Sequence, residues 1–267
     1  MDTELRLSGW AVVRGASSGF GEATSLELAR RGMDIFGVHL DRRGTMPNVE
    51  RITAAIRALG RQAHFFNVNA ADADKRKEVV EVVERESAGA TPRVRVLLHS
   101  LAFGTLRPFI TEPADAGINK VQMDMTSDVM GHSLVYWTQD LVARGLLGKD
   151  SRVYAMTSAG GHRMMPSYGA VSAAKAALES HVRQLAYELA PRGITANAIC
   201  AGVTDTPALR KIPGSDVIVR VAQERNPSRR LTTPDDVARA IAALSHPHTG
   251  WITGNVINVD GGEDIAG

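Results

Sequence analysis

The feature that most constrains the fold is a glycine-rich turn, Gly15-Ala-Ser-Ser-Gly19-Phe-Gly21, between two segments of different periodicity. Residues 10–13 form a short apolar run typical of a buried strand, and from Phe20 to Arg31 apolar residues recur at helical spacing. Glycine permits a sharp turn and close approach of the backbone to a pyrophosphate, whose charge the helix N-terminus then binds. A plain strand-to-helix turn is the alternative. The place after the first strand of an alternating chain favours a dinucleotide site.

The rest of the chain repeats this alternation of strand and helix. Strands that alternate with helices of this length predict a parallel sheet with helices on both faces. Right-handed crossovers then give a single doubly wound α/β domain of the Rossmann type, with about seven parallel strands, over residues 1–267. Further strands are expected at 35–40, 63–68, 94–98, 152–156, 194–200 and 255–259, and helices at 49–59, 72–87, 120–146, 167–190 and from Pro234.

Composition excludes several other classes of protein. The 267 residues are 44% hydrophobic, enough for one large core, and the net charge of +2 gives no reason to expect nucleic-acid binding. One cysteine, Cys200, can form neither an internal disulfide nor a cysteine-based zinc site. No apolar run approaches the roughly 18 residues of a membrane span, and the charged start, Met1 to Arg6, does not resemble a signal peptide. We therefore expect a cytoplasmic protein without a metal site.

One long segment, residues 205–233, lacks a clear period and contains Pro207, Pro213 and Pro227. It follows the carboxyl end of a predicted strand, which is where ligands bind in doubly wound sheets. We therefore expect an irregular substrate lid there.

Tyr168 and Lys175 are the candidate catalytic pair. On a helix, seven residues place two side chains on one face, about 10 Å apart along the axis. A phenol has a pKa of about 10, and a nearby ammonium favours the phenolate and eases loss of the proton. An ordinary amphipathic helix carrying one tyrosine and one lysine is the alternative.

Several motifs in the same order resemble the short-chain dehydrogenase/reductase family. They are the glycine loop, Tyr168 with Lys175, residues 202–206 (Gly-Val-Thr-Asp-Thr) and the ending 252–262 (Ile-Thr-Gly-Asn-Val-Ile-Asn-Val-Asp-Gly-Gly). One departure is Arg14, which stands where the family usually has threonine before the first glycine. The resemblance covers nearly the whole chain and implies a nicotinamide dinucleotide as cofactor, with Lys175 holding its ribose.

The spacing between tyrosine and lysine resembles one branch of that family. Most members that act on alcohols and ketones place lysine four residues after tyrosine, whereas Tyr-x6-Lys is similar to the enoyl-acyl-carrier-protein reductases of fatty acid synthesis. Residues 98–103 (Leu-His-Ser-Leu-Ala-Phe), 128–133 (Asp-Val-Met-Gly-His-Ser) and 200–202 (Cys-Ala-Gly) also resemble that branch.

Within this branch the sequence is most similar to the type III, NADPH-dependent subgroup. Ser158 stands where common bacterial enoyl reductases carry a second tyrosine, and residues 104–108 and 204–209 resemble type III sequences. The resemblance implies that Ser158, or Thr157 beside it, donates a hydrogen bond to the substrate's thioester carbonyl. Backbone-satisfied hydroxyls at a strand end are the alternative for both.

The choice of dinucleotide depends on the end of the second strand. The acidic residue that selects NAD in the family aligns with His39, and Asp41 lies two places later. Arg42 and Arg43 stand where a 2′-phosphate can be held, which favours NADPH over NADH, although a solvated surface pair is the alternative. The cofactor-binding residues that the resemblance implies are Gly15, Ser17, Ser18, Gly19, Phe20, Gly21, His39, Asp41, Arg42, Arg43, Asn69, Ala70, Ser100, Leu101, Ala102, Lys175, Gly202, Val203, Thr204 and Thr206.

The resemblance implies reduction of an enoyl thioester, with Tyr168 stabilising the enolate oxygen. The acyl group is carried by acyl-carrier protein or coenzyme A, and basic residues at 210–211, 225 and 229–230 are candidates for receiving an acidic carrier, or else a solvated face. A 3-oxoacyl thioester or ketone reductase on the same scaffold is the alternative, and an inactive dinucleotide-binding regulator is a rival of another class. The family's assembly implies a homotetramer. Apolar residues that could line an acyl pocket are Met164, Met165, Ile212, Val217 and Val221.

Overall fold

A computed structural model describes residues 5–90, 92–212 and 214–266. Its centre is a seven-stranded, all-parallel sheet in the order β3-β2-β1-β4-β5-β6-β7, which confirms the predicted doubly wound architecture. The order reverses direction after β1, so the first crevice at the carboxyl edge lies between β1 and β4. The strands are β1 (Trp10–Arg14), β2 (Asp34–His39), β3 (Ala63–Asn67), β4 (Val94–His99), β5 (Arg152–Ser158), β6 (Thr195–Ala201) and β7 (Val256–Val259).

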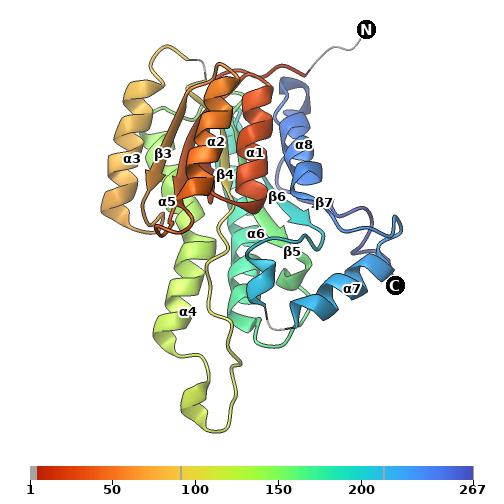
Figure 1. Ribbon diagram of the computed structural model, residues 1–267. Helices are drawn as coiled ribbons and strands as arrows, with labels where there is room; N and C mark the ends of the chain where they lie inside the picture. Colours follow the sequence, from red (N-terminus) through yellow and green to blue (C-terminus); the bar gives the residue numbers. More distant parts are fainter. Residues whose placement is uncertain (1–4, 91, 213, 267) are drawn as a thin grey trace.

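Helices cover both faces of this sheet (Figure 1). On one face lie α1 (Gly19–Arg30), α2 (Met46–Ala58) and α8 (Pro234–Leu244), which share a core cluster with alternate residues of β1, β2 and β4. On the other face lie α3 (Ala73–Glu86), α5 (Ser133–Ala143) and α6 (Gly169–Leu189), with the remaining strand residues. Because successive strand side chains point to opposite faces, the central strands are apolar on both sides.

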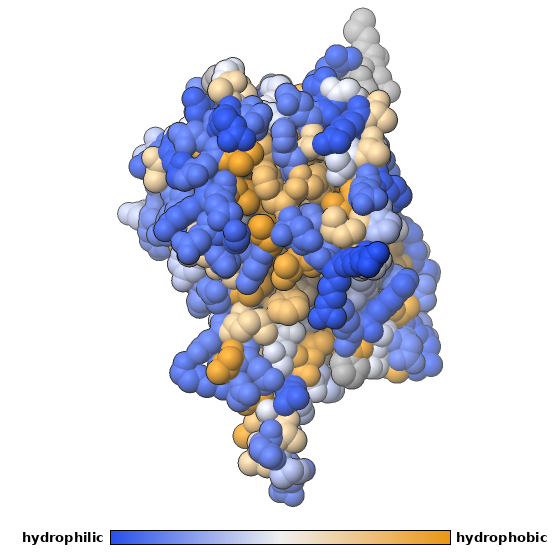
Figure 2. Space-filling model, turned by 60° about the vertical axis from the view of Figure 1, so that its left-hand side comes forward, coloured by the Kyte–Doolittle hydropathy of each residue, from blue (hydrophilic) through white to orange (hydrophobic). Residues whose placement is uncertain are grey.

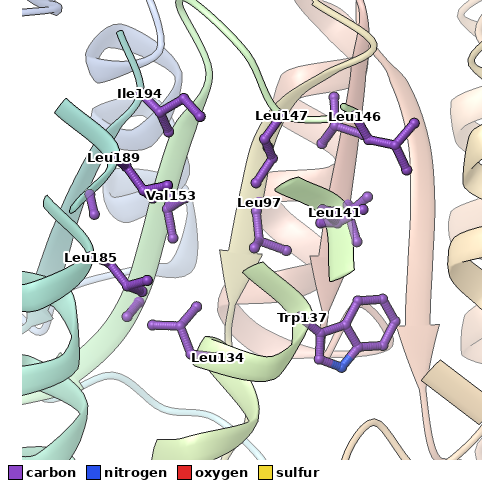
Figure 3. Close-up of a cluster of buried hydrophobic side chains, with 14 of the residues drawn as sticks. Leu97, Leu134, Trp137, Leu141, Leu146, Leu147, Val153, Leu185, Leu189 and Ile194 are labelled. Atoms are coloured by element: carbon purple, nitrogen blue, oxygen red, sulfur yellow. The ribbon is translucent and has the colours of Figure 1, made fainter. Parts of the chain in front are cut away.

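The second of these cores shows why α5 and α6 form where they do. Leu134, Trp137 and Leu141 repeat at helical spacing on α5, and all three are fully buried against Leu97 of β4 and Val153 of β5 (Figure 3). Each such side chain contributes roughly 1.5–3 kcal/mol by leaving water. The indole Nε1 of Trp137 donates to the carbonyl oxygen of Ala70 at 2.8 Å, which ties α5 to the loop after β3.

The helix expected over 120–146 is not continuous. α4 (Lys120–Ser127) and α5 are joined by a π-helical turn at Asp128–His132, and α5 ends at Ala143. The turn brings Gly131 against α6, where a Cβ would lie 3.3 Å from the carbonyl oxygen of Ala174. Close packing against α6 therefore overrides the regular helical period, as is common for π turns near functional sites.

The segment 205–233 is more regular than expected. It contains a short 3-10 turn at Leu209–Lys211 and the helix α7 (Ser215–Arg225), so the prediction of an irregular backbone is wrong for these residues, whereas their role as a lid stays a prediction. Val217 and Val221, one turn apart on α7, line a cavity and remain 48% and 40% exposed. Pro213 and residues 1–4 of the charged N-terminal stretch lie outside the described residues.

Two further features of the molecule are visible from outside. The segment between β4 and α4 extends away from the sheet (Figure 1), and Figure 2 shows apolar side chains gathered in a band beside hydrophilic ones. Within the described part of the chain, no helix is both long and apolar enough to cross a bilayer.

Candidate active site

A cavity of about 510 Å³ lies at the carboxyl edge of the sheet. Segments that follow β4, β5 and β6 line it together with α6 and α7, so it occupies the place that doubly wound sheets give to ligands. All five apolar residues expected in an acyl pocket line it, including Met164 and Ile212. The predicted catalytic and cofactor residues that line it are Phe20, Ser100, Leu101, Ala102, Thr157, Ser158, Tyr168, Lys175, Gly202, Val203, Thr204 and Thr206.

Tyr168 is the N-cap of α6 and not a residue within the helix, because Ser167 before it adopts a left-handed φ of 61°. Of the two residues expected on one helical face, Lys175 therefore lies within α6, whereas Tyr168 lies at the N-cap before it. The ring of Tyr168 packs so closely on Gly160 that a Cβ on Gly160 would lie 2.5 Å from Cε1 of the ring. Burial raises the pKa of the Tyr168 hydroxyl, and the neighbouring Ser158 opposes part of that shift. The expected lowering of the Tyr168 pKa by the Lys175 ammonium is therefore wrong for the protein without bound ligand.

Lys175 lies about two turns further along, within α6, and is buried. Its Nζ donates to the carbonyl oxygen of Met156 in β5 at 2.6 Å, rather than to Tyr168. Burial lowers the pKa of Lys175 to about 8, and the charge of Glu179 opposes this. The ammonium therefore loses its proton in a pH range where an exposed lysine keeps it.

The two hydroxyls at the end of β5 have different partners. Thr157 Oγ1 donates to Glu179 Oε1 at 2.6 Å, so its proton is engaged within the chain, and donation from Thr157 to a substrate carbonyl stays a prediction. Ser158 Oγ, by contrast, is buried and makes no hydrogen bond of regular geometry among the residues described, although it lies near enough to the Tyr168 hydroxyl to lower that group's pKa. A buried hydroxyl that no regular hydrogen bond engages is suited to donate to a ligand oxygen. Of the two candidates, the geometry favours Ser158.

Glu179 was missed by the sequence prediction. It lies four residues after Lys175 on α6, and that spacing was the available signal because residues i and i+4 share a helical face. A Cβ on Gly161 would lie 3.2 Å from Glu179 Oε1, so the carboxylate packs under the turn that follows β5. Its negative charge thus lies beside Lys175 and beneath the tyrosine.

The glycine loop fits a dinucleotide. Gly15 has a φ of 84°, and a Cβ there would lie 2.2 Å from the carbonyl oxygen of Ser100, so only glycine allows this close passage of two loops. α1 begins at Gly19, and the side chain of its N-cap, Ser18, makes no capping hydrogen bond. The N–H groups of the first turn thus remain for an anion, as the pyrophosphate reading requires.

The predicted ribose-binding residues lie at the ends of β2 and β3. His39 is buried, and its Nδ1 lies 2.9 Å from Asp41 Oδ2, while hydrogen bonds from Thr45, Ser17 and His39 outweigh burial and lower the pKa of Asp41. Arg42 and Arg43 are exposed.

The structure does not place all predicted residues in the cavity. Asn69 is exposed, and its Oδ1 accepts from the backbone N of Ala71 at 3.0 Å, a local turn that engages the atom expected near an adenine. The remaining predicted residues lie along the carboxyl edge outside the cavity lining: Gly15, Ser17, Ser18, Gly19, Gly21, His39, Asp41, Arg42, Arg43, Asn69 and Ala70.

Residues near the C-terminus close one side of the cavity, which the sequence did not predict. Glu263 Oε2 accepts from the backbone N of Val203 at 3.1 Å. Asp264 pairs with Arg163 at 2.8 Å. Burial, the largest of several causes, raises the pKa of Glu263. The Val203 contact holds the loop after β6, and the Arg163 contact holds the segment after β5.

Several basic residues proposed for carrier recognition are engaged by the chain itself. Arg210 binds Asp205 through two contacts of 2.8 Å, and Arg230 pairs with Asp236 at 2.7 Å. Arg225 donates to the carbonyl oxygen of Ala266 at 2.7 Å. No cluster of three or more metal-ligating side chains occurs among the described residues.

Comparison with known proteins decides the family. The profile of the family described as enoyl-(acyl carrier protein) reductase matches residues 15–263. The chain belongs to this family. It is thus a short-chain dehydrogenase/reductase near the enoyl-reductase branch, and a nicotinamide-dependent oxidoreductase.

Individual relatives include both enoyl reductases and 3-oxoacyl reductases. An enoyl-(acyl-carrier-protein) reductase (NADH) of Aquifex aeolicus (strain VF5) is 31% identical over 172 residues, which span 64% of this chain and 63% of that enzyme. A 3-oxoacyl-(acyl-carrier-protein) reductase of Thermotoga maritima is 28% identical over 262 residues, 97% of this chain and 99% of that enzyme. The crystal structure of the enoyl-(acyl-carrier-protein) reductase (NADH) from Aquifex aeolicus VF5 has a TM-score of 0.83 at 24% identity and covers 98% of both chains, a likeness of fold.

Proposed function

We propose that this enzyme reduces the carbon–carbon double bond of a trans-2-enoyl thioester. The observation that carries the proposal is the placement of the neighbouring Tyr168 and Ser158 hydroxyls together in a cavity with apolar walls. The Tyr-x6-Lys spacing and the His-Ser-Leu-Ala segment after β4 support the enoyl-reductase branch over the ketoreductases.

A nicotinamide dinucleotide, when bound, supplies the hydride that reaches the β-carbon of the enoyl group. Tyr168 then donates a hydrogen bond to the thioester oxygen, on which negative charge develops as the enolate forms. Ser158 Oγ donates to the same oxygen, and the α-carbon is protonated afterwards. Since burial raises the pKa of the Tyr168 hydroxyl, it keeps its proton at neutral pH and acts as a donor.

NADPH is the proposed cofactor, and NADH is the alternative. Arg42 and Arg43 are exposed at the end of β2, where guanidinium groups can meet a 2′-phosphate. Asp41 next to them remains an anion that opposes a 2′-phosphate, and its carboxylate is turned toward His39, 2.9 Å away. Gly15, Gly19 and Gly21 would hold the pyrophosphate, and Lys175 the nicotinamide ribose.

The acyl chain would lie among the apolar residues of the cavity, including Met165, Val217 and Val221. The carrier is acyl-carrier protein or coenzyme A. Lys211, which lines the cavity and is exposed, is a cation that either carrier would meet on binding.

We propose a homotetramer as the assembly. Exposed apolar side chains lie on the surface of α4 and α5, where Val121 is 76% exposed and Tyr136 is 38% exposed, and near the edge strand β7, where Trp251 is 98% exposed. Exposed apolar surface of this kind is typical of subunit contacts.

The function is tested by following oxidation of NADPH and NADH with crotonyl and acetoacetyl thioesters in parallel assays. Faster reduction of the crotonyl thioester supports enoyl reduction. Preference for the acetoacetyl thioester would instead establish the ketoreductase alternative, and dinucleotide binding without turnover on either substrate would favour the inactive regulator.

A further inference from the structure

Arg14 is an unusual residue for its position. It is the last residue of β1, immediately before Gly15, and it is fully buried. The resemblance described above predicts a threonine there. A long charged side chain in the interior is rare unless a partner offsets its charge.

The partners of the Arg14 side chain are all neutral. Nη1 donates to the carbonyl oxygen of Ser133 at 3.0 Å, and Nη2 donates to Ser133 Oγ at 2.6 Å. Nη2 also contacts Nδ1 of His99, the residue that pairs with Arg14 in the register of β1 and β4. The guanidinium lies 5.3 Å from the ring centroid of Trp137, while Nε has no hydrogen-bond partner among the described residues.

His99 does not add a charge to this cluster. A guanidinium can only donate, so His99 Nδ1 must accept, and Nε2 carries the proton toward the carbonyl oxygen of Met130 at 3.0 Å. Burial first, and then the charges of Arg14 and Lys175, hold the pKa of His99 well below its usual range. The imidazole is therefore neutral.

The charge of Arg14 is not balanced within the described part of the chain. None of its hydrogen bonds there reaches a carboxylate, and the charged residue that acts on it most strongly, Arg76, is itself a cation paired with Asp140 at 2.6 Å. Guanidinium groups stay protonated in proteins, so a net positive charge is buried at this point. Such a charge is unfavourable unless an anion approaches it.

The location of this charge indicates which anion would balance it. The carbonyl oxygen of Arg14 accepts from the backbone N of Ser100 at 2.9 Å, and Gly15 continues directly into the glycine loop. We propose that Arg14 is the buried counter-charge for the pyrophosphate of the dinucleotide, acting through the protein interior from the α5 side of the sheet, where its guanidinium meets Ser133 and Trp137. Low-dielectric surroundings strengthen this attraction and shield it from salt. The inference rests on the dinucleotide chemistry of the proposed function and adds a residue to it.

The test compares two ligands that differ in the diphosphate, ADP and adenosine, by calorimetry or NMR titration. Arg14→Gln keeps hydrogen-bonding capacity and removes the charge, whereas Arg14→Lys keeps the charge. We expect Arg14→Gln to weaken ADP binding about tenfold and adenosine binding less than twofold, and Arg14→Lys to stay within about threefold of the parent for ADP.

Arg152→Gln is the matched control. Arg152 is also buried, but it lies at the start of β5, at the amino end of the parallel strands, and its guanidinium donates to the backbone oxygens of Ser151 and His246. This variant should bind ADP like the parent. If Arg14→Gln does not fold, as judged by circular dichroism, Arg14→Thr takes its place.

Two outcomes overturn the inference: unchanged ADP affinity in the neutral variant, or equal losses for ADP and adenosine, which would make Arg14 merely structural. Neither measurement needs turnover. A parent protein that binds ADP but reduces no thioester would thus contradict the proposed reaction and leave the role of Arg14 intact.

Discussion

The Nζ atom of Lys175 lies 2.6 Å from the carbonyl oxygen of Met156, one residue before Thr157, whose hydroxyl donates to Glu179. Helix α6 is thereby joined to the end of β5 by two contacts, one cationic and one anionic. Tyr168 begins the same helix, and its ring lies above this junction against Gly160. The position of the tyrosine and the charge of the lysine therefore depend on Gly160, Met156 and Glu179 as well as on the pair itself.

Replacement of Tyr168 by phenylalanine tests the oxyanion donor. Loss of one donor aimed at developing charge costs about 3 kcal/mol, so kcat should fall on the order of 10²–10³-fold with enoyl thioesters. Dinucleotide affinity should change little, since only the hydroxyl is removed. Stopped-flow or steady-state oxidation of NADPH measures the first quantity, and nearly full activity in this variant would remove Tyr168 from the mechanism.

The pKa of Lys175 predicts a pH dependence of cofactor binding. Because burial lowers this pKa to about 8, the ammonium is lost as the pH rises through that value. Affinity for the dinucleotide should therefore decline above about pH 8 and be steady below it. Glu179→Gln removes the charge that raises the pKa, so the decline should begin at lower pH.

Glu188→Gln on the exposed side of the same helix is the control for this prediction. It removes the same charge without touching Lys175, and its binding profile should coincide with that of the parent. Titrations of dinucleotide fluorescence between pH 6 and about 9.5 would measure all three profiles. An unchanged midpoint in Glu179→Gln would show that the carboxylate does not act on the lysine.

Gly160→Ala tests whether the position of the tyrosine ring matters. The added methyl group would lie 2.5 Å from Cε1 of Tyr168, so the ring must move. Since small displacements of a catalytic group are costly, kcat should fall about tenfold or more. Gly148→Ala is the matched control, because a Cβ there meets nothing within 4 Å, and it should retain parental kcat. Equal kcat values in Gly160→Ala and Gly148→Ala would contradict the claim that catalysis depends on close packing of the Tyr168 ring against Gly160.

The double variant Arg42→Ala, Arg43→Ala tests the cofactor preference. Two guanidinium groups near a 2′-phosphate favour NADPH, so the Kd for NADPH should rise about tenfold, whereas that for NADH should stay within twofold. NADH serves as the internal control, because it lacks only that phosphate. A parallel loss for both dinucleotides, measured by fluorescence, would argue against a 2′-phosphate site.

The order of strands and helices could be predicted from the sequence because periodicity and the glycine loop act locally. Every strand was expected within about two residues of its place. The π turn at Asp128–His132 could not be predicted from the sequence, since it depends on the packing of Gly131 against α6, a segment about 40 residues later. The helix that begins at Ser215 could not be predicted either, since Ala222 is its one buried residue among those described and no buried apolar face marks its period.

The same difference between local sequence pattern and tertiary packing separates the site residues that could be predicted from those that could not. Tyr168, Ser158 and Lys175 were found from motif spacing, and they meet in one cavity. The direction of the Thr157 hydroxyl and the involvement of Glu179 were not, because side-chain partners across elements are set by tertiary packing. Arg14 was visible as a departure from the family pattern, but its neutral surroundings appear only in the folded chain.

The most direct test of enoyl reduction follows the hydrogen itself. Purified enzyme is supplied with a trans-2-enoyl thioester and NADPH deuterated at the transferred position, and the product is characterised by mass spectrometry and NMR. The account predicts a saturated acyl thioester with one deuterium on the β-carbon. Recovery of the enoyl thioester unchanged, while a 3-oxoacyl thioester is converted to its 3-hydroxy product under the same conditions, would contradict it.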